Sequence, residues 1–247
     1  MNIFKRRKWI ILLISIVIIV FIIFFIYVSN YYKAMPEVVS FMSSDDNVEF
    51  IENLPWIEYE AKNKEVTKGL ILYPGGKVEA EAYSPLAKRI AESGFKVVIV
   101  PMPFNLSVFS PNKAKEVINT YTQIDKWYIG GHSLGGVMAS RFTYDNLDII
   151  EGLILLASYP PNSSDMSSST IRVLSISGTE DGLVDKDKIE ASKELLPEST
   201  EFLWIEGGNH SQMGWYGFQS GDNTATIKRE KQQDIITKSI VQFMKIN

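Results

Sequence analysis

The stretch Lys126-Trp-Tyr-Ile-Gly-Gly-His-Ser-Leu-Gly-Gly136 carries the most specific structural pattern in the sequence. Its first four residues form a short apolar run, typical of a strand that is covered on both faces. Gly131 and Gly135 lie two positions before and two positions after Ser133, a spacing that permits a sharp turn from a strand into a helix. Such a turn lifts the serine hydroxyl above the sheet, at a helix N-terminus that favours developing negative charge. We therefore expect Ser133 to be a nucleophile.

Apolar runs of the same kind recur along the chain on both sides of this stretch. Strands are predicted at residues 69–73, 96–100, 126–129, 152–156, 171–176 and 201–205, and helices at residues 80–93, 112–124, 134–146, 185–196 and 227–244. Strand alternating with helix predicts an α/β fold, a mainly parallel sheet with right-handed crossovers and helices on both faces. In such a sheet the ligand site lies beyond the carboxyl ends of the strands.

The chain contains two histidines and no cysteine. Thiol catalysis, disulfides and thiolate metal sites are therefore excluded, and two histidines argue against a multi-histidine metal site. A serine hydroxyl needs a neighbouring base, and His210 follows the last predicted strand, where the strand-end rule requires one. His132 adjoins Ser133 on the turn, so its side chain should diverge from the serine. We expect His132 to pack or to support a loop.

A carboxylate is needed to orient the imidazole of the base and to stabilise its charged form. Asp181 follows the fifth predicted strand. The chain order Ser133, Asp181, His210 is the order expected for a serine nucleophile on this kind of sheet. Glu180 and Asp185 are the alternatives, and we expect them to be a solvated loop residue and a helix cap respectively.

An oxyanion hole needs two preorganised N–H donors, one from the residue after the nucleophile and one from the loop after an early strand. Leu134 fits the first position. The second donor is expected in Tyr73-Pro-Gly-Gly-Lys77, where we favour Gly76 and keep Lys77 as the alternative. This stretch also fits an ordinary glycine turn. It lacks the upstream spacing of a phosphate-binding P-loop, so nucleotide binding is not expected.

The N-terminal segment has the composition of a membrane anchor. Four basic residues at positions 5–8 precede the uncharged run 9–28, which is apolar except for Ser15. Twenty helical residues span roughly 30 Å, the thickness of the hydrocarbon core of a bilayer. Because the basic residues precede the run, we expect the N-terminus in the cytoplasm and the globular domain outside the cell, at the cell membrane. A cleaved signal peptide and a buried core helix are the alternatives.

The predicted organisation has four parts. They are a cytoplasmic basic segment at 1–8, a transmembrane anchor at 9–28, an irregular polar tether at 29–50 and one catalytic domain at 51–247. A chain of 247 residues is long enough for a single α/β domain and short for two. The formal net charge of −4 leaves no basic field suited to nucleic acid, which we exclude as a partner.

Four segments together resemble the α/β-hydrolase superfamily and, within it, the small bacterial group called α/β-hydrolase family 5, near the dienelactone-hydrolase-like enzymes. They are Leu72-Tyr-Pro-Gly-Gly-Lys-Val78, Gly130-Gly-His-Ser-Leu-Gly-Gly136, Gly178-Thr-Glu-Asp-Gly182 and Gly207-Gly-Asn-His-Ser-Gln-Met-Gly-Trp-Tyr-Gly217. The resemblance covers the chain from about residue 66 to the end. It implies a Ser133, Asp181, His210 triad that hydrolyses esters or related acyl bonds, with no cofactor.

Many members of the superfamily carry a helical lid after the strand that here ends near Ala157. This chain has only the Ser- and Pro-rich segment 159–170 at that point, too short for a lid domain, so we expect an open site. Five aromatic residues near the expected mouth either bind an apolar acyl group or belong to the core: Phe104, Phe109, Trp215, Tyr216 and Phe218.

The expected function is that of a carboxylesterase-like serine hydrolase acting on a small-molecule acyl substrate through an acyl-enzyme, with neither cofactor nor metal. Thioester cleavage, amide cleavage and acyl transfer use the same catalytic groups and remain open. A catalytically silent, surface-displayed binding domain on the same fold is the alternative from another class. The presence of Ser133, Asp181 and His210 argues against that alternative.

Overall fold

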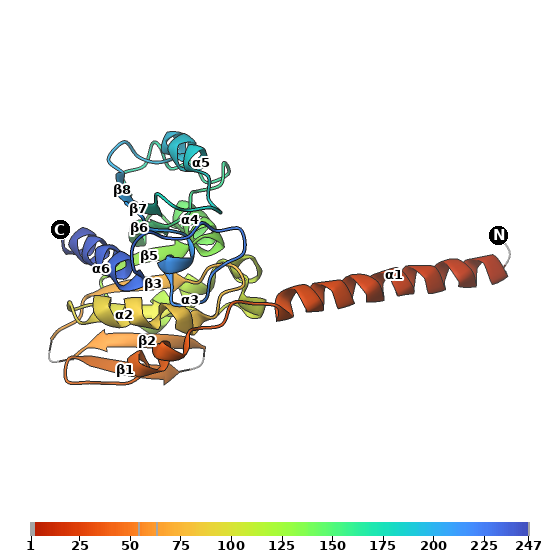
Figure 1. Ribbon diagram of the computed structural model, residues 1–247, viewed down its shortest axis with the longest axis horizontal. Coiled ribbons are helices and arrows are strands. Elements are labelled where there is room, and N and C mark those ends of the chain that lie inside the picture. The colour runs from red at the N-terminus through yellow and green to blue at the C-terminus, as the bar shows by residue number, and fades with distance from the viewer. Residues whose placement is uncertain (1–2, 54, 63, 247) are drawn as a thin grey trace. The chain divides into compact units, whose positions relative to one another are not determined.

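The computed structural model describes residues 3–53, 55–62 and 64–246, and the chain divides into two compact units, Met1–Tyr31 and Tyr32–Asn247. The first unit is the helix α1, Ile3–Ser29. Of the expected basic segment 1–8, residues 1 and 2 lie outside the described residues. The second unit contains all the strands and the remaining helices (Figure 1).

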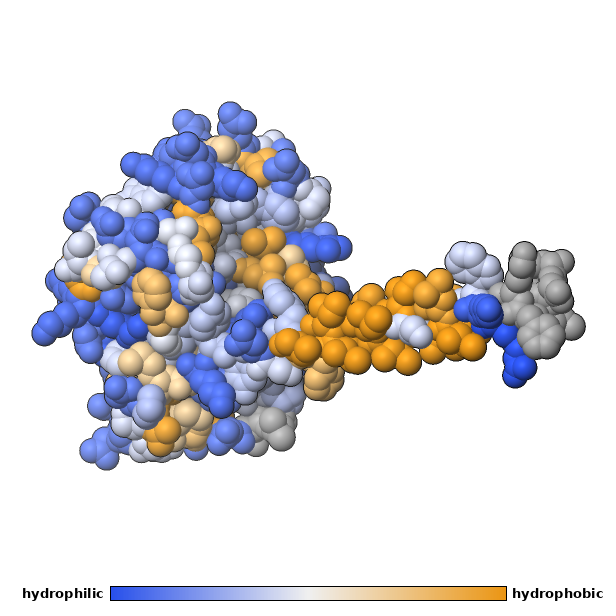
Figure 2. Space-filling model, turned by 45° about the vertical axis from the view of Figure 1, so that its right-hand side comes forward, coloured by the Kyte–Doolittle hydropathy of each residue, from blue (hydrophilic) through white to orange (hydrophobic). Residues whose placement is uncertain are grey.

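Helix α1 contains a 23-residue stretch, Arg7–Ser29, with a mean hydropathy of 3.5. None of the most apolar window of this stretch is buried within the protein, and the face of the helix that is visible in Figure 2 is mostly hydrophobic. Because this window is not buried, the helix does not fit the alternative of a buried core helix. By length and composition the helix can cross a membrane, and a signal sequence has the same properties.

The second unit is built on an eight-stranded sheet with the order β1-β2-β4-β3-β5-β6-β7-β8. Strands β1 and β2 are antiparallel to each other, β2 is antiparallel to β4, and the strands from β4 to β8 are parallel. The strands are β1 Val48–Asn53, β2 Trp56–Ala61, β3 Lys68–Tyr73, β4 Lys96–Ile99, β5 Lys126–His132, β6 Ile150–Leu156, β7 Arg172–Gly178 and β8 Glu201–Ile205. The predicted mainly parallel sheet is confirmed.

Helices cover both faces of this sheet. They are α2 Ser84–Ala91, α3 Lys113–Thr120, α4 Leu134–Asp145, α5 Lys186–Ala191 and α6 Arg229–Lys245, with short 3-10 helices at Pro36–Phe41, Ala80–Tyr83, Pro103–Asn105, Ser107–Phe109, Ser192–Leu195 and Ser211–Met213. Leu86 of α2 and Ile240 of α6 belong to one core cluster, whereas Val117 of α3 and Phe142 of α4 belong to a second cluster.

Strand β3 shows why the predicted strands are apolar at successive positions. Leu70 and Leu72 belong to the core cluster that contains α2 and α6, and Ile71 and Tyr73 belong to the cluster that contains α3 and α4. All four side chains are fully buried. Because side chains alternate between the faces of a strand, a sheet covered on both faces needs apolar residues at every position.

The hairpin of β1 and β2 is absent from the sequence prediction. Strand β2 carries Glu58 and Glu60, which interrupt the apolar pattern, yet Glu58 is 1% exposed. Lys96, the first residue of β4, forms ion pairs with Glu58 and Glu60 at distances of 2.9 and 2.7 Å. The charges that hid this strand are therefore paired with a lysine 36 positions away from Glu60.

Part of the segment expected as an irregular tether at 29–50 is instead packed on the second unit. The amide of Tyr32 donates to the carbonyl of Lys77 at 2.7 Å, and the amide of Glu79 donates to the carbonyl of Tyr32 at 3.0 Å. The carboxylate of Glu79 also accepts the amide of Ala34 at 2.7 Å. These contacts are long-range in sequence, so the polar composition of the segment did not reveal them.

The connection between β6 and β7 contains neither a helix nor a strand. It comprises residues 157–171, all of them described, and forms only turns and bends. The expectation that no lid domain follows β6 is confirmed.

Candidate active site

Ser133 occupies a strained turn between β5 and α4. Its φ of 51° and ψ of −120° lie outside the regions that most residues adopt. Its amide donates to Leu156 at 2.9 Å, and its carbonyl accepts the hydroxyl of Ser158 at 2.7 Å, so both neighbouring segments hold the turn. A Cβ on Gly131 would lie 2.3 Å from the carbonyl carbon of Gly135, and a Cβ on Gly135 would lie 2.3 Å from a backbone oxygen of β3. The turn therefore requires both glycines.

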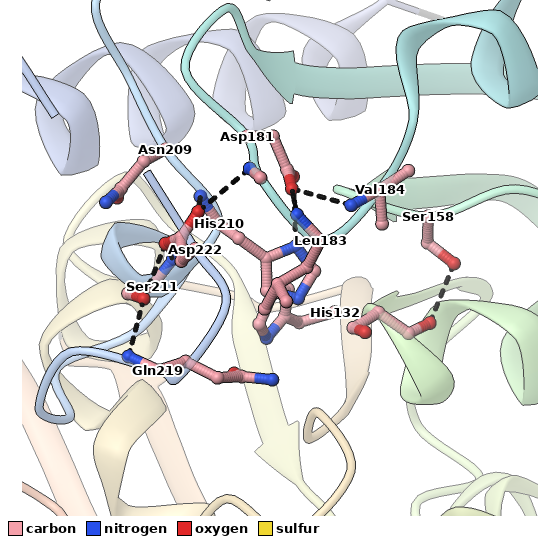
Figure 3. A network of polar contacts seen from close by, with 12 residues as sticks. His132, Ser158, Asp181, Leu183, Val184, Asn209, His210, Ser211, Gln219 and Asp222 are labelled. Carbon is pink, nitrogen blue, oxygen red and sulfur yellow. Dashed lines mark hydrogen bonds and ion pairs between the residues drawn. The ribbon is translucent and has the colours of Figure 1, made fainter. Parts of the chain in front are cut away.

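Asp181 and His210 meet at the carboxyl ends of the neighbouring strands β7 and β8. Nδ1 of His210 lies 2.9 Å from Oδ2 of Asp181, and the two side chains are 1% and 3% exposed respectively. The other carboxylate oxygen of Asp181 accepts the amides of Leu183 and Val184 at 2.9 and 2.8 Å (Figure 3). Because Nδ1 donates to this fixed carboxylate, the imidazole presents Nε2 as its basic atom.

Nε2 of His210 is buried and has no hydrogen-bond partner among the described residues. The structure thus brings Asp181 and His210 together but shows no hydrogen bond from Ser133 to the imidazole. The ring of His210 lies 4.5 Å, centroid to centroid, from the ring of His132, the residue before Ser133. In structures without a bound substrate, catalytic hydrogen bonds are often long or poorly aligned.

The two alternatives to Asp181 lie elsewhere. Asp185 is exposed and caps the N-terminus of α5, where its carboxylate accepts the amide of Asp187 at 3.0 Å. Glu180 is partly exposed, and its amide donates to the carbonyl of Gly208. Asp185 is therefore a helix cap, as expected.

His132 links the serine turn to the loop after β3. The hydroxyl of Tyr83 lies 2.7 Å from Nδ1 of His132 and also accepts the amide of Gly75 at 2.9 Å. Complete burial, together with the nearby His210, holds the pKa of His132 well below its usual 6.5, so this imidazole is neutral. The expected loop-supporting role fits these contacts, but the ring lies beside His210 rather than apart from the site.

The predicted oxyanion donors Gly76 and Leu134 lie side by side. A Cβ built on Gly76 would lie 3.1 Å from Cδ2 of Leu134. The amide of Lys77 donates to the carbonyl of Asn105 at 2.7 Å, and the amide of Gly75 donates to Tyr83, so both are already used. Within the described chain the amides of Gly76 and Leu134 make no hydrogen bond. This geometry favours Gly76 over Lys77.

The first turns of α6 fix the loop that carries His210. Gln232 accepts the amide of Asn209 at 3.0 Å and donates to its carbonyl at 2.8 Å. Gln233 donates to the carbonyl of Gln212 at 2.7 Å. Arg229 donates to the carbonyls of Ser211 and Gly214, which follow His210 in the chain. Burial of the Arg229 guanidinium lowers its pKa from the ordinary value. The loop that carries His210 is therefore held by hydrogen bonds from α6.

The aromatic residues expected at the mouth divide into two groups. Trp215 and Tyr216 are buried, at 7% and 0% exposure, and Tyr216 belongs to the core cluster that contains α2 and α6. Phe104, Phe109 and Phe218 are about half exposed. The rings of Phe104 and Phe109 meet edge to face with a centroid distance of 5.7 Å. The core interpretation is therefore correct for Trp215 and Tyr216.

The sequence analysis missed Asp222, Tyr83 and the residues of α6 that support the site. Asp222 lies in a polar loop where aspartate is common, and Tyr83 belongs to the predicted helix at 80–93. None of them belongs to a motif that marks its role. In the part of the chain that the structure describes, no group of three or more His, Cys, Asp or Glu side chains is arranged to hold a metal ion.

A serine on a strand-to-helix turn, followed by a hydrogen-bonded Asp–His pair at the carboxyl edge of a mainly parallel sheet, defines the class of α/β hydrolases. The chain belongs to the alpha/beta hydrolase family, whose pattern it matches over residues 69–234. This result confirms the resemblance to the superfamily. The nearer resemblance to dienelactone-hydrolase-like enzymes stays a prediction.

Solved structures with the same fold include Est1E from Butyrivibrio proteoclasticus, at 14% identity and a TM-score of 0.58, covering 80% of this chain and 99% of that one. The hydrolase MGS-MChE2, from a lagoon-sediment metagenome, is 15% identical with a TM-score of 0.58 and coverages of 78% and 98%. A CIB-like hydrolase from Thermoplasma acidophilum is 16% identical with a TM-score of 0.56 and coverages of 79% and 97%. At these identities the likeness shows the fold.

Proposed function

We propose that the second unit is a serine hydrolase that cleaves a carboxylic ester or a related acyl bond through an acyl-enzyme. The observation that carries the proposal is the buried Asp181–His210 hydrogen bond beside the Ser133 turn, with Nε2 of His210 unpartnered among the residues that the structure describes. A buried imidazole nitrogen without a partner is costly. Such an atom is expected where a substrate completes the site.

In the proposed reaction, Nε2 of His210 accepts the proton of the Ser133 hydroxyl while the serine oxygen bonds to the substrate carbonyl carbon. The amides of Gly76 and Leu134 donate to the resulting oxyanion. His210 then gives its proton to the leaving alcohol, and the acyl group stays on Ser133. A water molecule, deprotonated by the same nitrogen, releases the acid and restores the serine.

The family and one of the similar structures support this reaction type. Alpha/beta hydrolases share the strand-turn-helix position that Ser133 occupies. One structure of Est1E, 14% identical to this chain, contains bound ferulic acid, a carboxylic acid. A carboxylic acid is one of the two products that ester hydrolysis releases. The same catalytic groups could also cleave thioesters and amides, so assays with esters, thioesters and amides are needed to identify the leaving group.

We further propose that α1 is an uncleaved signal anchor that holds the catalytic unit on the outer side of the cell membrane. The apolar composition of Arg7–Ser29 and the basic residues before it support this orientation. N-terminal sequencing of the mature protein from membranes tests the anchor. A mature chain that begins after residue 28 would contradict the anchor and indicate a secreted enzyme.

The experiment for the catalytic proposal compares the full chain with Ser133→Ala in covalent labelling by a fluorophosphonate. Wild type should be labelled and should hydrolyse p-nitrophenyl esters, and the variant should do neither. Esters of graded acyl length then rank the substrates. A correctly folded wild type that is neither labelled nor active would instead favour a catalytically silent binding domain.

A further inference from the structure

Asp222 is a buried carboxylate to which the proposed reaction assigns no role. It is 8% exposed and lies in the loop between the 3-10 helix Ser211–Met213 and α6. Among the described residues no cation lies within ion-pair distance of it. A buried charge without a counter-ion needs several hydrogen-bond donors.

Backbone and hydroxyl donors surround this carboxylate on both oxygens (Figure 3). Oδ1 accepts the amides of Gly182 and Asn223 at 3.0 and 2.9 Å, and more weakly that of His210 at 3.4 Å. Oδ2 accepts the amide and the hydroxyl of Ser211 at 2.7 and 2.6 Å. The backbone amide of Gln219 in turn donates to the hydroxyl oxygen of Ser211 at 3.0 Å.

Two of the residues that donate to Asp222 are chain neighbours of Asp181 and His210. Gly182 is the residue after Asp181, and Ser211 is the residue after His210. One carboxylate therefore holds both loops at the residue adjacent to each member of the Asp–His pair. The acid loop also fits closely against the Asp222 loop, because a Cβ on Gly182 would lie 2.7 Å from the amide nitrogen of Asn223.

We propose that Asp222 is a positioning residue that sets the 2.9 Å contact between Asp181 and His210 by hydrogen-bonding to the loops that carry them. The inference rests on the proposed function for its catalytic consequence. The contact itself is independent of any activity. Without the carboxylate, the two loops lose the acceptor that they share, and the imidazole loses its fixed orientation.

Asp222→Asn is the main variant, because it keeps the size of the side chain. Its N–H₂ group replaces one carboxylate oxygen and cannot accept the hydrogen bonds that this oxygen accepts in wild type. A misplacement of about 1 Å costs on the order of a hundredfold in rate. We expect kcat to fall about tenfold to a hundredfold with KM nearly unchanged. Ser211→Ala removes one of the donors to Asp222, together with the acceptor of the Gln219 backbone amide, and should lower kcat about twofold to tenfold. Asp185→Asn, an exposed cap away from the pair, is the matched control and should behave as wild type.

The decisive readout does not require activity. Since the chain has two histidines, ¹⁵N-histidine labelling of the full chain in detergent gives signals from His132 and His210 alone. Wild type should show a downfield, exchange-protected Nδ1 proton for His210, hydrogen-bonded to Asp181. In Asp222→Asn this signal should weaken or vanish, although circular dichroism and the melting temperature show a folded protein.

Each outcome decides the inference. A wild-type Nδ1 signal and a wild-type labelling rate in both Asp222→Asn and Ser211→Ala would overturn it. If Asp222→Asn fails to fold, Ser211→Ala decides alone, through a shifted Nδ1 signal or an unchanged one. If wild type is never labelled by the fluorophosphonate, the proposed function fails, and the histidine spectra still test whether Asp222 holds the pair.

Discussion

Two buried polar clusters in the second unit contain carboxylates, and they are neutralised in different ways. Between β2 and β4, Lys96 pairs with Glu58 and Glu60, and its ammonium lies 4.0 Å from the ring centroid of Tyr121. At the carboxyl ends of β7 and β8, Asp181 is held by backbone amides and by an imidazole. In the first cluster every charge has a partner of opposite charge. In the second, Nε2 of His210 has no partner in the part of the chain that the structure describes.

This difference between the Lys96 cluster and the Asp181–His210 pair indicates which of the two could act on a substrate. A buried carboxylate that is held by its own counter-ion is not available to a substrate, so disruption of the Lys96–Glu58 pair should affect folding alone. A buried imidazole nitrogen without a partner carries an energetic cost, and among the described residues Nε2 of His210 and Nε2 of His132 both lack one. We therefore expect changes in the first cluster to alter stability and changes in the second to alter the rate.

Asp181→Asn should have the largest effect on the rate. The amide cannot stabilise the imidazolium and favours the wrong tautomer of His210, so kcat should fall by about 10³- to 10⁴-fold. Steady-state hydrolysis of a p-nitrophenyl ester measures this change, with Asp185→Asn as the control. A loss of less than tenfold in a folded variant would remove Asp181 from the proposed triad.

Lys96→Met should have a large effect on stability and a small one on the rate. The variant leaves the Glu58 carboxylate buried without its counter-ion, a change that costs about 3–5 kcal/mol. Urea denaturation should show this loss, while kcat per folded molecule stays near that of wild type. Adding Glu58→Gln should recover part of the stability. A selective loss of kcat would place this cluster in the catalytic machinery and break the comparison.

Tyr83→Phe should have a moderate effect on the rate. It removes the hydroxyl that joins the amide of Gly75 to Nδ1 of His132, and so loosens the loop that carries Gly76. The loss of such hydrogen bonds should lower kcat by roughly tenfold with little change in KM. Equal effects on the rate of fluorophosphonate labelling would support a role in the oxyanion loop. An unchanged kcat would show that the Tyr83–His132 contact is only structural.

The pH dependence of stability should show the smallest effect, through His132. Its pKa is lowered in the folded protein, so it stays neutral there and takes up a proton on unfolding below about pH 6.5. Proton uptake by the unfolded chain makes the protein less stable as pH falls, by about 1.4 kcal/mol between pH 7.5 and 5.5. In His132→Gln this part of the slope should disappear. An identical slope in the two proteins would show that His132 is not buried in its neutral form.

The sequence predicted the parts of the site that depend on local pattern. The turn around Ser133 follows from two glycines and an apolar run, and the strand-end rule selected Asp181 and His210, which the structure brings together. Gly76 is supported by the neighbouring Leu134, although no single residue in the loop distinguished it from Lys77. Short-range spacing carries this information because each element has a characteristic period.

Most features that the sequence did not reveal depend on contacts between separate elements of the chain. Glu58 and Glu60 hid β2 because charged residues are rarely buried without a partner, and Lys96, their partner, belongs to another strand. The polar segment that contains Tyr32 is ordered by pairing with the loop after β3. Asp222 is a polar residue in a polar loop, and only its five donors distinguish it. These contacts have no signature in a single sequence.

Mass-spectrometric mapping of the residue that a fluorophosphonate modifies tests the central claim most directly. We expect a single phosphonylated peptide, modified at Ser133, in the folded full chain, and no modified peptide in His210→Ala at the same exposure. Modification of a different serine, or equal modification of Ser133 in the His210→Ala protein, would contradict it.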